Sequence, residues 1–208
     1  MKVVSDKDLV ELLDGSLEMT SVKNHVLLTH DRAIKRFHGG SRSTPRFNRE
    51  VKALRRLQGL EGFPTLLEVS PADRRLQISR VDGQPMSTCE KIPDSVFVSL
   101  RQQVQTMLER GVARHSLPAR DVIVRNDGSA GLVDFERSRC RRFRFGLIWL
   151  ASCQVTRFQL LRLIDEQAPH LLNGRERRWL DLQRNLRTIY RRYWLDVRQR
   201  RRNRTGKR

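Results

Sequence analysis

The sequence is poor in cysteine and lacks a cysteine-pairing pattern. Its three cysteines, Cys89, Cys140 and Cys153, are widely spaced, and none forms the Cys-x-x-Cys spacing of zinc-binding or redox motifs. An odd number of isolated cysteines argues against a disulfide framework and against a structural zinc site. The sequence therefore predicts a protein of a reducing compartment, the cytoplasm.

Long hydrophobic runs are also absent. The longest, Phe145 to Val155, is too short for the roughly 20 residues that a transmembrane helix needs. Charged residues interrupt the apolar residues of the first segment, MKVVSDKDLVELL, unlike the continuous apolar core of a signal peptide. We expect no membrane-spanning helix and no signal peptide, while peripheral attachment to the inner face of the membrane stays open.

Acidic residues are scarce relative to basic ones. The 208 residues contain 42 Lys and Arg against 23 Asp and Glu, which gives a formal net charge of +19 and a pI of about 11.3. The last twelve residues, VRQRRRNRTGKR, carry seven cations and no acid. At 38% hydrophobic residues the chain is long and apolar enough to fold into a globular core. The charge predicts attraction to polyanions such as nucleotides, anionic lipid or nucleic acid.

The first part of the chain alternates helix and strand patterns. A short helix is expected at Asp6–Leu13, because Ser5 is a good amino-terminal cap. Thr44 and Pro45 are typical of a cap and a first-turn proline, and open a second helix that ends near Gly59. Strands are expected at residues 25–30, 33–37, 63–70 and 74–81.

The second part is mostly helical. A break at residues 82–85 precedes amphipathic helices at residues 94–110, 145–164 and 174–200. Strands first and helices afterwards predict an α+β protein with two lobes. The expected divisions are an amino-terminal lobe at residues 1–83, a helical carboxy-terminal lobe at residues 84–197 and a basic tail at residues 198–208.

A β-hairpin is expected between the first two of these helices. In the segment RHSLPARDVIVRNDGSAGLVDFE, residues 114–136, two apolar triplets at 122–124 and 131–133 flank the turn sequence Asn126-Asp127-Gly128. The hairpin begins at Asp121 and ends at Asp134. A carboxylate at each end predicts a clamp for a hard divalent cation, which prefers oxygen ligands.

Four motifs follow one another along the chain: AIKRF in a strand, REVKALRRL in a helix, ISRVDGQPM at the break and VDFE at the end of the hairpin. Their order resembles that of the protein-kinase-like superfamily, and most closely small bacterial kinases of lipopolysaccharide-core sugars (Kdo or heptose) and RIO-like kinases. The first two resemble the strand that carries the kinase lysine and the helix whose glutamate pairs with that lysine. The third resembles the hinge, and VDFE stands where kinases have Asp-Phe-Gly. The resemblance covers roughly residues 20 to 165.

This resemblance implies ATP and Mg²⁺ as cofactors. Lys35 would contact the nucleotide phosphates and would be held by Glu50, while Asp134 would bind the metal that bridges the phosphates. Asp121 would supply the second metal ligand in place of the usual asparagine, which keeps an oxygen donor.

The catalytic loop allows two alignments with kinases. In the first, Arg120 and Asp121 match the Arg-Asp pair of the loop, and Asn126 is the metal-binding asparagine. In the second, Asp121 replaces that asparagine, so that Ser116 occupies the place of the catalytic aspartate and Arg114 the place of the preceding histidine. The second is favoured, because the first leaves too few residues for the hairpin.

Two features depart from an active kinase. Ser116 cannot act as the carboxylate that orients the acceptor hydroxyl, and His115 or Asp127 would have to substitute. The loop expected to cover the phosphates, TSVKN at residues 20–24, contains no glycine. Two hypotheses therefore stand. The first is a phosphotransferase acting on a hydroxyl of a cell-envelope saccharide or a protein, and the second is a catalytically impaired pseudokinase that binds lipid, a protein partner or RNA.

Two arginine-rich stretches indicate an anionic partner. Residues 137–144, RSRCRRFR, follow the D-F-E motif, where a kinase acceptor docks, and residues 198–208 form the basic tail. They predict contact with an anionic acceptor or a membrane surface. RNA is an alternative partner for the tail, and DNA is not expected.

Overall fold

The computed structural model describes residues 7–11, 17–21, 24–38, 40–143 and 146–185. The chain divides into two compact units, residues 1–160 and 161–208. Each unit is described separately below, with the first unit first.

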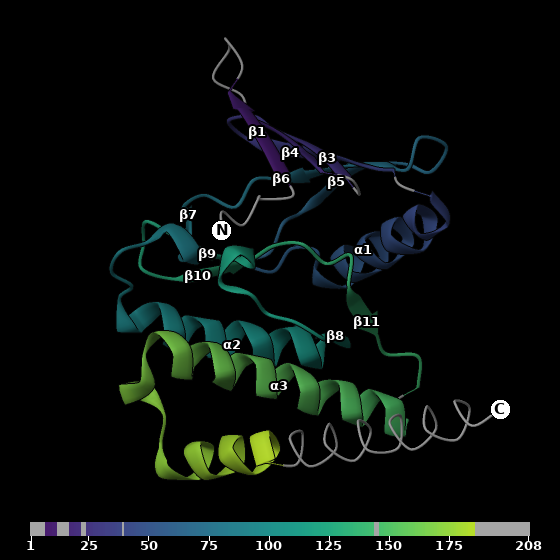
Figure 1. Cartoon of the computed structure of the whole chain (residues 1–208). Helices are drawn as coiled ribbons and strands as arrows, with labels where there is room; N and C mark the ends of the chain where they lie inside the picture. Colours follow the sequence, from purple (N-terminus) through teal and green to yellow (C-terminus); the bar gives the residue numbers. More distant parts are fainter. Residues whose placement is uncertain (1–6, 12–16, 22–23, 39, 144–145, 186–208) are drawn as a thin grey trace, which may run out of the picture. The chain divides into compact units, whose positions relative to one another are not determined.

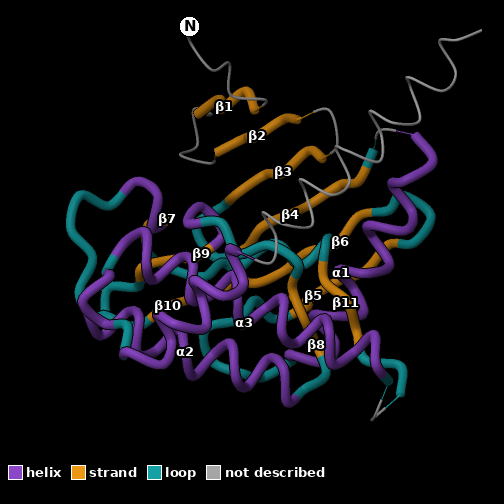
Figure 2. Tube along the Cα trace, turned by 60° about the horizontal axis from the view of Figure 1, so that its bottom comes forward, coloured by secondary structure: helices purple, strands orange, loops and turns teal. Residues whose placement is uncertain are grey.

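An antiparallel six-stranded sheet forms the amino-terminal part of the first unit. The strands lie in the order β1-β2-β3-β4-β6-β5, and Figure 2 shows β1 to β4 side by side. Each strand pairs with its neighbour in antiparallel register. The bounds are Lys7–Glu11 for β1, Leu17–Ser21 for β2, Asn24–Leu28 for β3, Arg32–Phe37 for β4, Leu66–Ser70 for β5 and Arg75–Ser79 for β6.

The helix predicted at Asp6–Leu13 is wrong. Residues Lys7–Glu11 form strand β1, which pairs with β2 along its whole length. A serine cap is a weak local preference, whereas the edge of a neighbouring strand offers hydrogen bonds to every second backbone group. Strand β2 was not predicted either. The other four expected strands are present, with ends shifted by at most three residues.

Helix α1 (Ser43–Leu57) packs beneath this sheet, as Figure 1 shows. Its apolar residues at helical spacing, Phe47, Val51, Leu54 and Leu57, are all buried. The ring of Phe47 meets Phe37 of β4 edge to face, with centroids 5.8 Å apart. The predicted cap at Thr44 is wrong, because the helix already starts at Ser43, directly after the 3₁₀ turn η1 (Gly40–Arg42).

Helix α2, the hairpin, one separate short strand pair and the first part of α3 make up the carboxy-terminal part of the first unit (Figure 1). The predicted hairpin is present: its strands pair antiparallel, and a short strand, β7, extends the pair into a three-stranded sheet. Strand β8, which precedes the hairpin in the sequence, and strand β11, which follows it, form a separate antiparallel pair. The bounds are Gln84–Pro85 for β7, Met86–Thr88 for η2, Asp94–Glu109 for α2, Val112–Arg114 for β8, Ala119–Asp121 for η3, Val122–Val124 for β9, Ala130–Leu132 for β10, Ser138–Cys140 for β11 and Leu147–Gln167 for α3.

The predicted lobe boundary near residue 83 coincides with a change of sheet. Strand β6 ends the six-stranded sheet at Ser79, and β7 pairs with β9 of the hairpin. The divisions at residues 83 and 197 stay predictions, and the tail lies outside the described residues. The fold is α+β, with a strand-rich amino-terminal part and a helical carboxy-terminal part.

The second unit contains the end of α3, a 3₁₀ turn η4 (Pro169–Leu171) and a helical segment at residues 174–185. Asn173 caps this segment: its Oδ1 accepts hydrogen bonds of 3.0 Å from the backbone N–H groups of Arg175 and Glu176. Glu176 in turn accepts from the backbone N–H of Asn173 at 3.0 Å, which completes a capping box. The rest of the predicted helix 174–200 lies outside the described residues.

Membrane-spanning helices are not found in the part of the chain that the structure describes, since none of its helices combines sufficient length with sufficient apolar character.

Gly83 provides a test of how closely the chain just before β7 approaches strand β9 of the hairpin. Its φ of 128° lies in a region that L side chains rarely adopt, and an added Cβ would collide with the carbonyl oxygen of Val124. We expect Gly83→Ala to lower the free energy of unfolding by roughly 3 kcal/mol or more, because strain and a backbone clash add.

Gly59→Ala is the matched control. Gly59 also has a positive φ, 76°, but no atom lies within 4 Å of an added Cβ, so a loss of roughly 1 kcal/mol is expected from backbone strain alone. Urea unfolding of both variants measures the difference. Equal losses would contradict the close contact between residue 83 and the hairpin.

Candidate functional site

Lys35 is held at the centre of the first unit by two carboxylates. Strand β4 alternates exposed and buried residues, and the alternation turns Lys35 inward with only 6% of its surface exposed. Its Nζ lies 2.7 Å from a carboxylate oxygen of Glu50 on α1 and 2.9 Å from one of Asp134. Strand β4, the nearby helix α1 and the segment after the hairpin, 99 residues further along the chain, therefore meet at one ammonium group.

The buried charges shift each other's protonation. Burial alone lowers the pKa of Lys35, but the carboxylates of Asp134 and Glu50 outweigh this effect and raise it above the usual value. Burial raises the pKa of Glu50 to about 7, against the opposing charge of Lys35. Lys35 therefore stays charged near neutrality, and Glu50 depends on this cation to remain ionised.

The two ends of the hairpin lie next to each other. The backbone N–H of Val133 donates to the carbonyl oxygen of Asp121 at 3.0 Å, which places Asp121 beside the residue that precedes Asp134. Asp134 has a φ of 65°, in the left-handed region that is rare for residues other than glycine. Such strain is concentrated at functional sites, where the surrounding structure holds it.

The structure places Asn126 away from Asp134. Strands β9 and β10 pair from Val122 with Leu132 to Val124 with Ala130, so Asn126 lies in the turn at the opposite end of the hairpin. Asn126 is exposed there. This arrangement disfavours the alignment in which Asn126 is a metal ligand, and favours the one in which Asp121 takes that place.

Arg114 ties the ends of the hairpin together. Its guanidinium donates to the carboxylate of Asp121 at 2.6 Å and to the carbonyl oxygen of Val133 at 2.9 Å. It also lies over the ring of Phe135, 5.3 Å from the centroid. Burial raises the pKa of Asp121, while the charge of Arg114 opposes the rise. The Asp121 carboxylate is therefore already in an ion pair.

A second buried network, not predicted from the sequence, lies beside Lys35. The Glu136 carboxylate accepts a hydrogen bond of 2.9 Å from Asn24 of β3 and lies 3.6 Å from the guanidinium of Arg46 on α1. Arg46 also donates to the side-chain oxygen of Asn24 at 3.2 Å. This network links the start of β3, α1 and the D-F-E segment. In the sequence, this network was indicated only by the charge of Glu136, two residues after Asp134.

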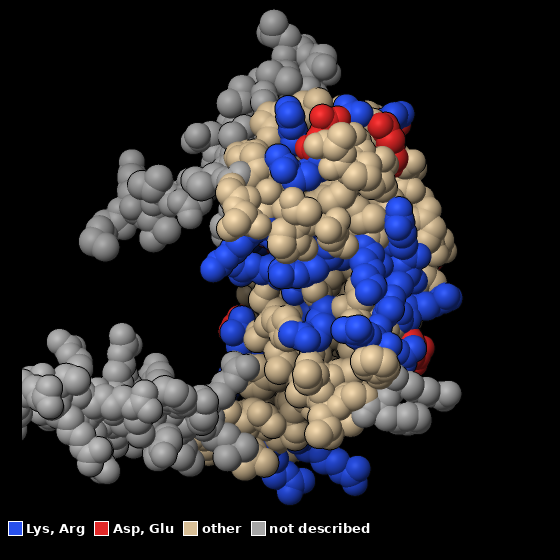
Figure 3. Space-filling model, turned by 90° about the vertical axis from the view of Figure 1, so that its right-hand side faces the viewer, with Lys and Arg blue, Asp and Glu red and all other residues tan. Residues whose placement is uncertain are grey.

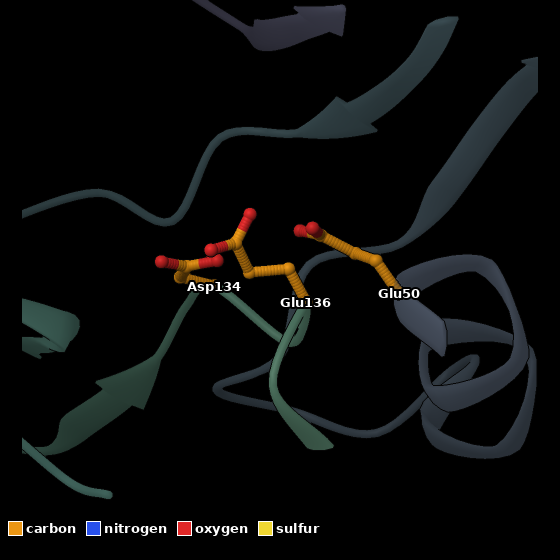
Figure 4. A group of neighbouring side chains, drawn as sticks. All are labelled: Glu50, Asp134 and Glu136. Carbon is orange, nitrogen blue, oxygen red and sulfur yellow. The ribbon is translucent and has the colours of Figure 1, made fainter. Parts of the chain in front are cut away.

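Three carboxylates gather around this point, as Figure 4 shows. One oxygen from each of Glu50, Asp134 and Glu136 lies within 4.8 Å of the other two. Glu50 and Glu136 are buried, whereas the side chain of Asp134 is 37% exposed. Asp134 is therefore the member of the group that a metal ion in solution can reach most easily.

The predicted catalytic residues lie in the loop between β8 and β9. His115 is exposed, and its Nε2 accepts a hydrogen bond of 3.5 Å from Arg139 of β11. Partial burial and the neighbouring Arg139 lower the pKa of His115, which keeps the ring neutral near pH 7. Ser116 is half-buried. A catalytic role for either residue stays a prediction.

The pairing of Lys35 with Glu50 can be tested through stability. In Lys35→Met the cation is removed, and Glu50 stays buried near two other carboxylates. We expect a loss of about 3 to 5 kcal/mol of unfolding free energy near pH 8, where Glu50 must ionise without a partner. The loss should shrink toward about pH 5, because the folded state with a raised Glu50 pKa binds a proton that the unfolded state lacks.

Urea unfolding at both pH values measures the effect. The control is Lys35→Met combined with Glu50→Gln, which removes the ionisable group. Its loss of unfolding free energy relative to wild type should be the same at both pH values. An identical loss for Lys35→Met at both pH values would mean that Glu50 is not the source of the cost.

Comparison with known proteins relates the fold to kinases. No family model matches the sequence, and no curated protein is similar to it in sequence. Among solved structures, a complex of WbdD with a kinase inhibitor superimposes with a TM-score of 0.51 at 19% identity, covering 79% of this chain and 49% of WbdD. A structure described as the bifunctional kinase-methyltransferase WbdD gives a TM-score of 0.51 at 18% identity, covering 77% of this chain.

This chain spans about half the length of those structures, 49% and 47% of the two chains. At such low identity the likeness concerns the fold alone. Together with the lysine strand, the helix that supplies Glu50 and the hairpin before the D-F-E segment, it shows that the chain has a protein-kinase-like α+β fold.

Proposed function

We propose that this chain is a kinase-like phosphotransferase that uses ATP and Mg²⁺ to phosphorylate a hydroxyl group. The observation that carries the proposal is the meeting of Lys35, Glu50 and Asp134, with Nζ–O distances of 2.7 and 2.9 Å. Phosphoryl transfer depends mainly on positioning and on stabilising negative charge, and these residues supply both.

Lys35 is the group that we propose for the nucleotide phosphates. An ammonium group has three donors, and two of them are used by Glu50 and Asp134. Glu50 fixes the direction of the side chain from α1. Because Asp134 is the more exposed partner, a phosphate can replace its contact with Lys35 while the contact with Glu50 remains.

The residues present fit a magnesium ion. Bound Mg²⁺ would neutralise charge on the phosphate oxygens, and it prefers carboxylate ligands. Asp134 offers an exposed carboxylate at one end of the hairpin. Asp121, at the other end, is the second proposed ligand. Asp121 is less available, since Arg114 lies 2.6 Å from it. Asp134 is therefore proposed as the principal ligand.

The weak point of the proposed site is the acceptor side. Ser116 provides a hydroxyl where a kinase has a carboxylate, and this half-buried group cannot act as a base near neutral pH. His115, whose pKa is lowered, is the neutral imidazole that we propose for this role, and its Nε2 must first release the hydrogen bond from Arg139 before it can accept a proton. General base catalysis is worth about 10²- to 10⁴-fold, so slow turnover is expected rather than none.

The proposed acceptor is anionic, most simply a phosphorylated or carboxylated saccharide of the cell envelope, and otherwise a protein. The exposed side chains of Arg137, Arg139 and Arg142 follow directly after the D-F-E segment. Guanidinium groups bind carboxylate and phosphate with two parallel hydrogen bonds, which suits such an acceptor.

The second candidate function is a pseudokinase, a binding or regulatory module without efficient catalysis. Two observations favour it. Asp121 is held in an ion pair by Arg114, and β2 and β3 are separated by residues 22 and 23 alone, which leaves little room for a phosphate-covering loop. The two candidates differ in whether bound nucleotide is turned over.

The Tm measured with ATP, with and without Mg²⁺, shows whether the protein binds the nucleotide. We expect ATP to raise the Tm only when Mg²⁺ is present, and Asp134→Asn to abolish the Mg²⁺-dependent rise, because the ion loses its principal ligand. The matched control is Asp127→Asn in the turn at the far end of the hairpin, where Asp127 accepts hydrogen bonds from Ser129. This variant should keep the Mg²⁺-dependent rise of the wild type. No shift in the wild type would remove the nucleotide proposal altogether.

Turnover is tested by replacing the residue in the catalytic position. Ser116→Asp supplies the missing carboxylate, and we expect it to raise kcat by about 10²-fold, measured as phosphate transfer from radiolabelled ATP to candidate saccharides. Ser87→Asp adds the same charge at an exposed position in η2 and should leave kcat unchanged. Mg²⁺-dependent binding without turnover in either protein would favour the pseudokinase.

A further inference from the structure

Exposed apolar side chains cluster at the start of α3. Phe143, Leu147, Ile148 and Leu150 are exposed to 68%, 83%, 67% and 51% of their surface, all within residues 143–150. Scattered exposed apolar residues are ordinary, but several in one short segment mark an interaction surface. The same segment also has an inward side, since Trp149 is buried.

The exposed apolar stripe is confined to the first turn of the helix. Further along the same side of α3, the exposed residues are Gln154 and Arg157. The apolar part is therefore a short wedge with a polar continuation. Such a wedge can enter a surface but cannot cross a bilayer.

Arginines surround the wedge. No Asp or Glu occurs in the sequence between Glu136 and Asp165. Arg137, Arg139 and Arg142 are exposed, and the guanidinium of Arg142 lies 5.5 Å from the centroid of the Phe143 ring. Arg142 thus adjoins the apolar wedge directly, and Arg137 and Arg139 precede it in the chain.

Helix α1 extends the positive charge. Its exposed cations are Arg49, Lys52 and Arg55. Its one acid, Glu50, is buried against Lys35. Arg56 fastens α1 to the residue before β8 and to the segment before α3 by donating to the carbonyl oxygens of Gly111 and Arg141, each at 2.7 Å. Figure 3 shows the result as a belt of Lys and Arg side chains across this face.

We propose that this face docks on an anionic lipid bilayer. The docking surface consists of the apolar residues Phe143, Leu147, Ile148 and Leu150 and the cations Arg137, Arg139 and Arg142. Apolar side chains enter the boundary between headgroups and acyl chains, and cations bind the lipid phosphates around them.

The apolar half decides between a bilayer and other polyanions. RNA is bound by cations and by aromatic rings on which bases stack, so exposed Leu147 and Ile148 would gain nothing from it. A soluble saccharide would likewise leave these side chains in water. A bilayer is the partner that uses both halves of the surface. The inference does not depend on the proposed phosphotransfer, since lipid binding needs neither nucleotide nor metal.

Vesicle flotation with the full chain tests the proposal. The probes are vesicles of phosphatidylcholine alone and of phosphatidylcholine mixed with phosphatidylglycerol. Wild type should bind the mixed vesicles, bind the neutral ones far more weakly, and be released as salt is raised. Leu147→Ser with Ile148→Ser should weaken binding about tenfold. Arg139→Gln with Arg142→Gln should weaken it about fivefold per arginine.

Matched controls show whether the effects are local. Leu67→Ser with Val98→Ser removes two apolar side chains of 52% and 55% exposure elsewhere, and Arg175→Gln with Arg178→Gln removes the same charge from the helical segment 174–185. Both controls should bind as wild type. Circular dichroism of every variant verifies folding, which substitution of such exposed side chains should preserve.

Three results would overturn the proposal. The first is equal binding by wild type and the Leu147 and Ile148 double variant, as would occur if the tail alone supplied the affinity. The second is sedimentation as a dimer that the same double variant dissociates, which would assign the face to a second copy of the chain. The third is tight RNA binding that the arginine variant weakens, with no binding to the mixed vesicles.

Discussion

The buried ammonium of Lys35 is the interaction on which the rest of the arrangement depends. A charge with 6% of its surface exposed is tolerable only when oppositely charged groups surround it, and these come from α1 and from the end of the hairpin. Strand, helix and hairpin must therefore be in their places together. The two ion contacts of Lys35 therefore constrain how strand, helix and hairpin are arranged in the first unit.

The hairpin meets this constraint through its own geometry. Antiparallel pairing returns the chain to its starting point, so that Asp134 arrives beside Asp121 whatever residues form the turn. Arg114 then fixes both strand ends by binding the side chain of one and the backbone before the other. The positive φ of Asp134 indicates that this position is held against a local preference. A carboxylate at each end of a hairpin is thus a way of presenting acids near a cation.

Much of this was predictable from local patterns. The strand of Lys35, the helix of Glu50 and the hairpin that ends at Asp134 each have a clear sequence signal, and the structure brings the three side chains together. Strand β1 was not predictable in this way, because its conformation comes from pairing with β2 rather than from its own residues. Local propensity is a weak guide where a sheet edge is available.

The network of Asn24, Arg46 and Glu136 could not be predicted from the sequence for a related reason. Asn24 and Glu136 are 112 residues apart, and neither belongs to a pattern that singles it out. The exposed wedge at the start of α3 was also unexpected, because an apolar run in a helix reads as core until its surroundings are known. Patterns show which residues prefer burial, whereas only the fold shows which of them achieve it.

The central claim is that Lys35 and Asp134 form one site for nucleotide and metal. A crystal structure grown with a non-hydrolysable ATP analogue and Mn²⁺ tests it most directly, because Mn²⁺ scatters anomalously and locates itself. The account predicts an anomalous peak beside Asp134, with the Nζ of Lys35 in contact with Glu50 and with a phosphate oxygen. A peak at other acidic residues, or a nucleotide bound away from an intact contact between Lys35 and Asp134, would contradict it.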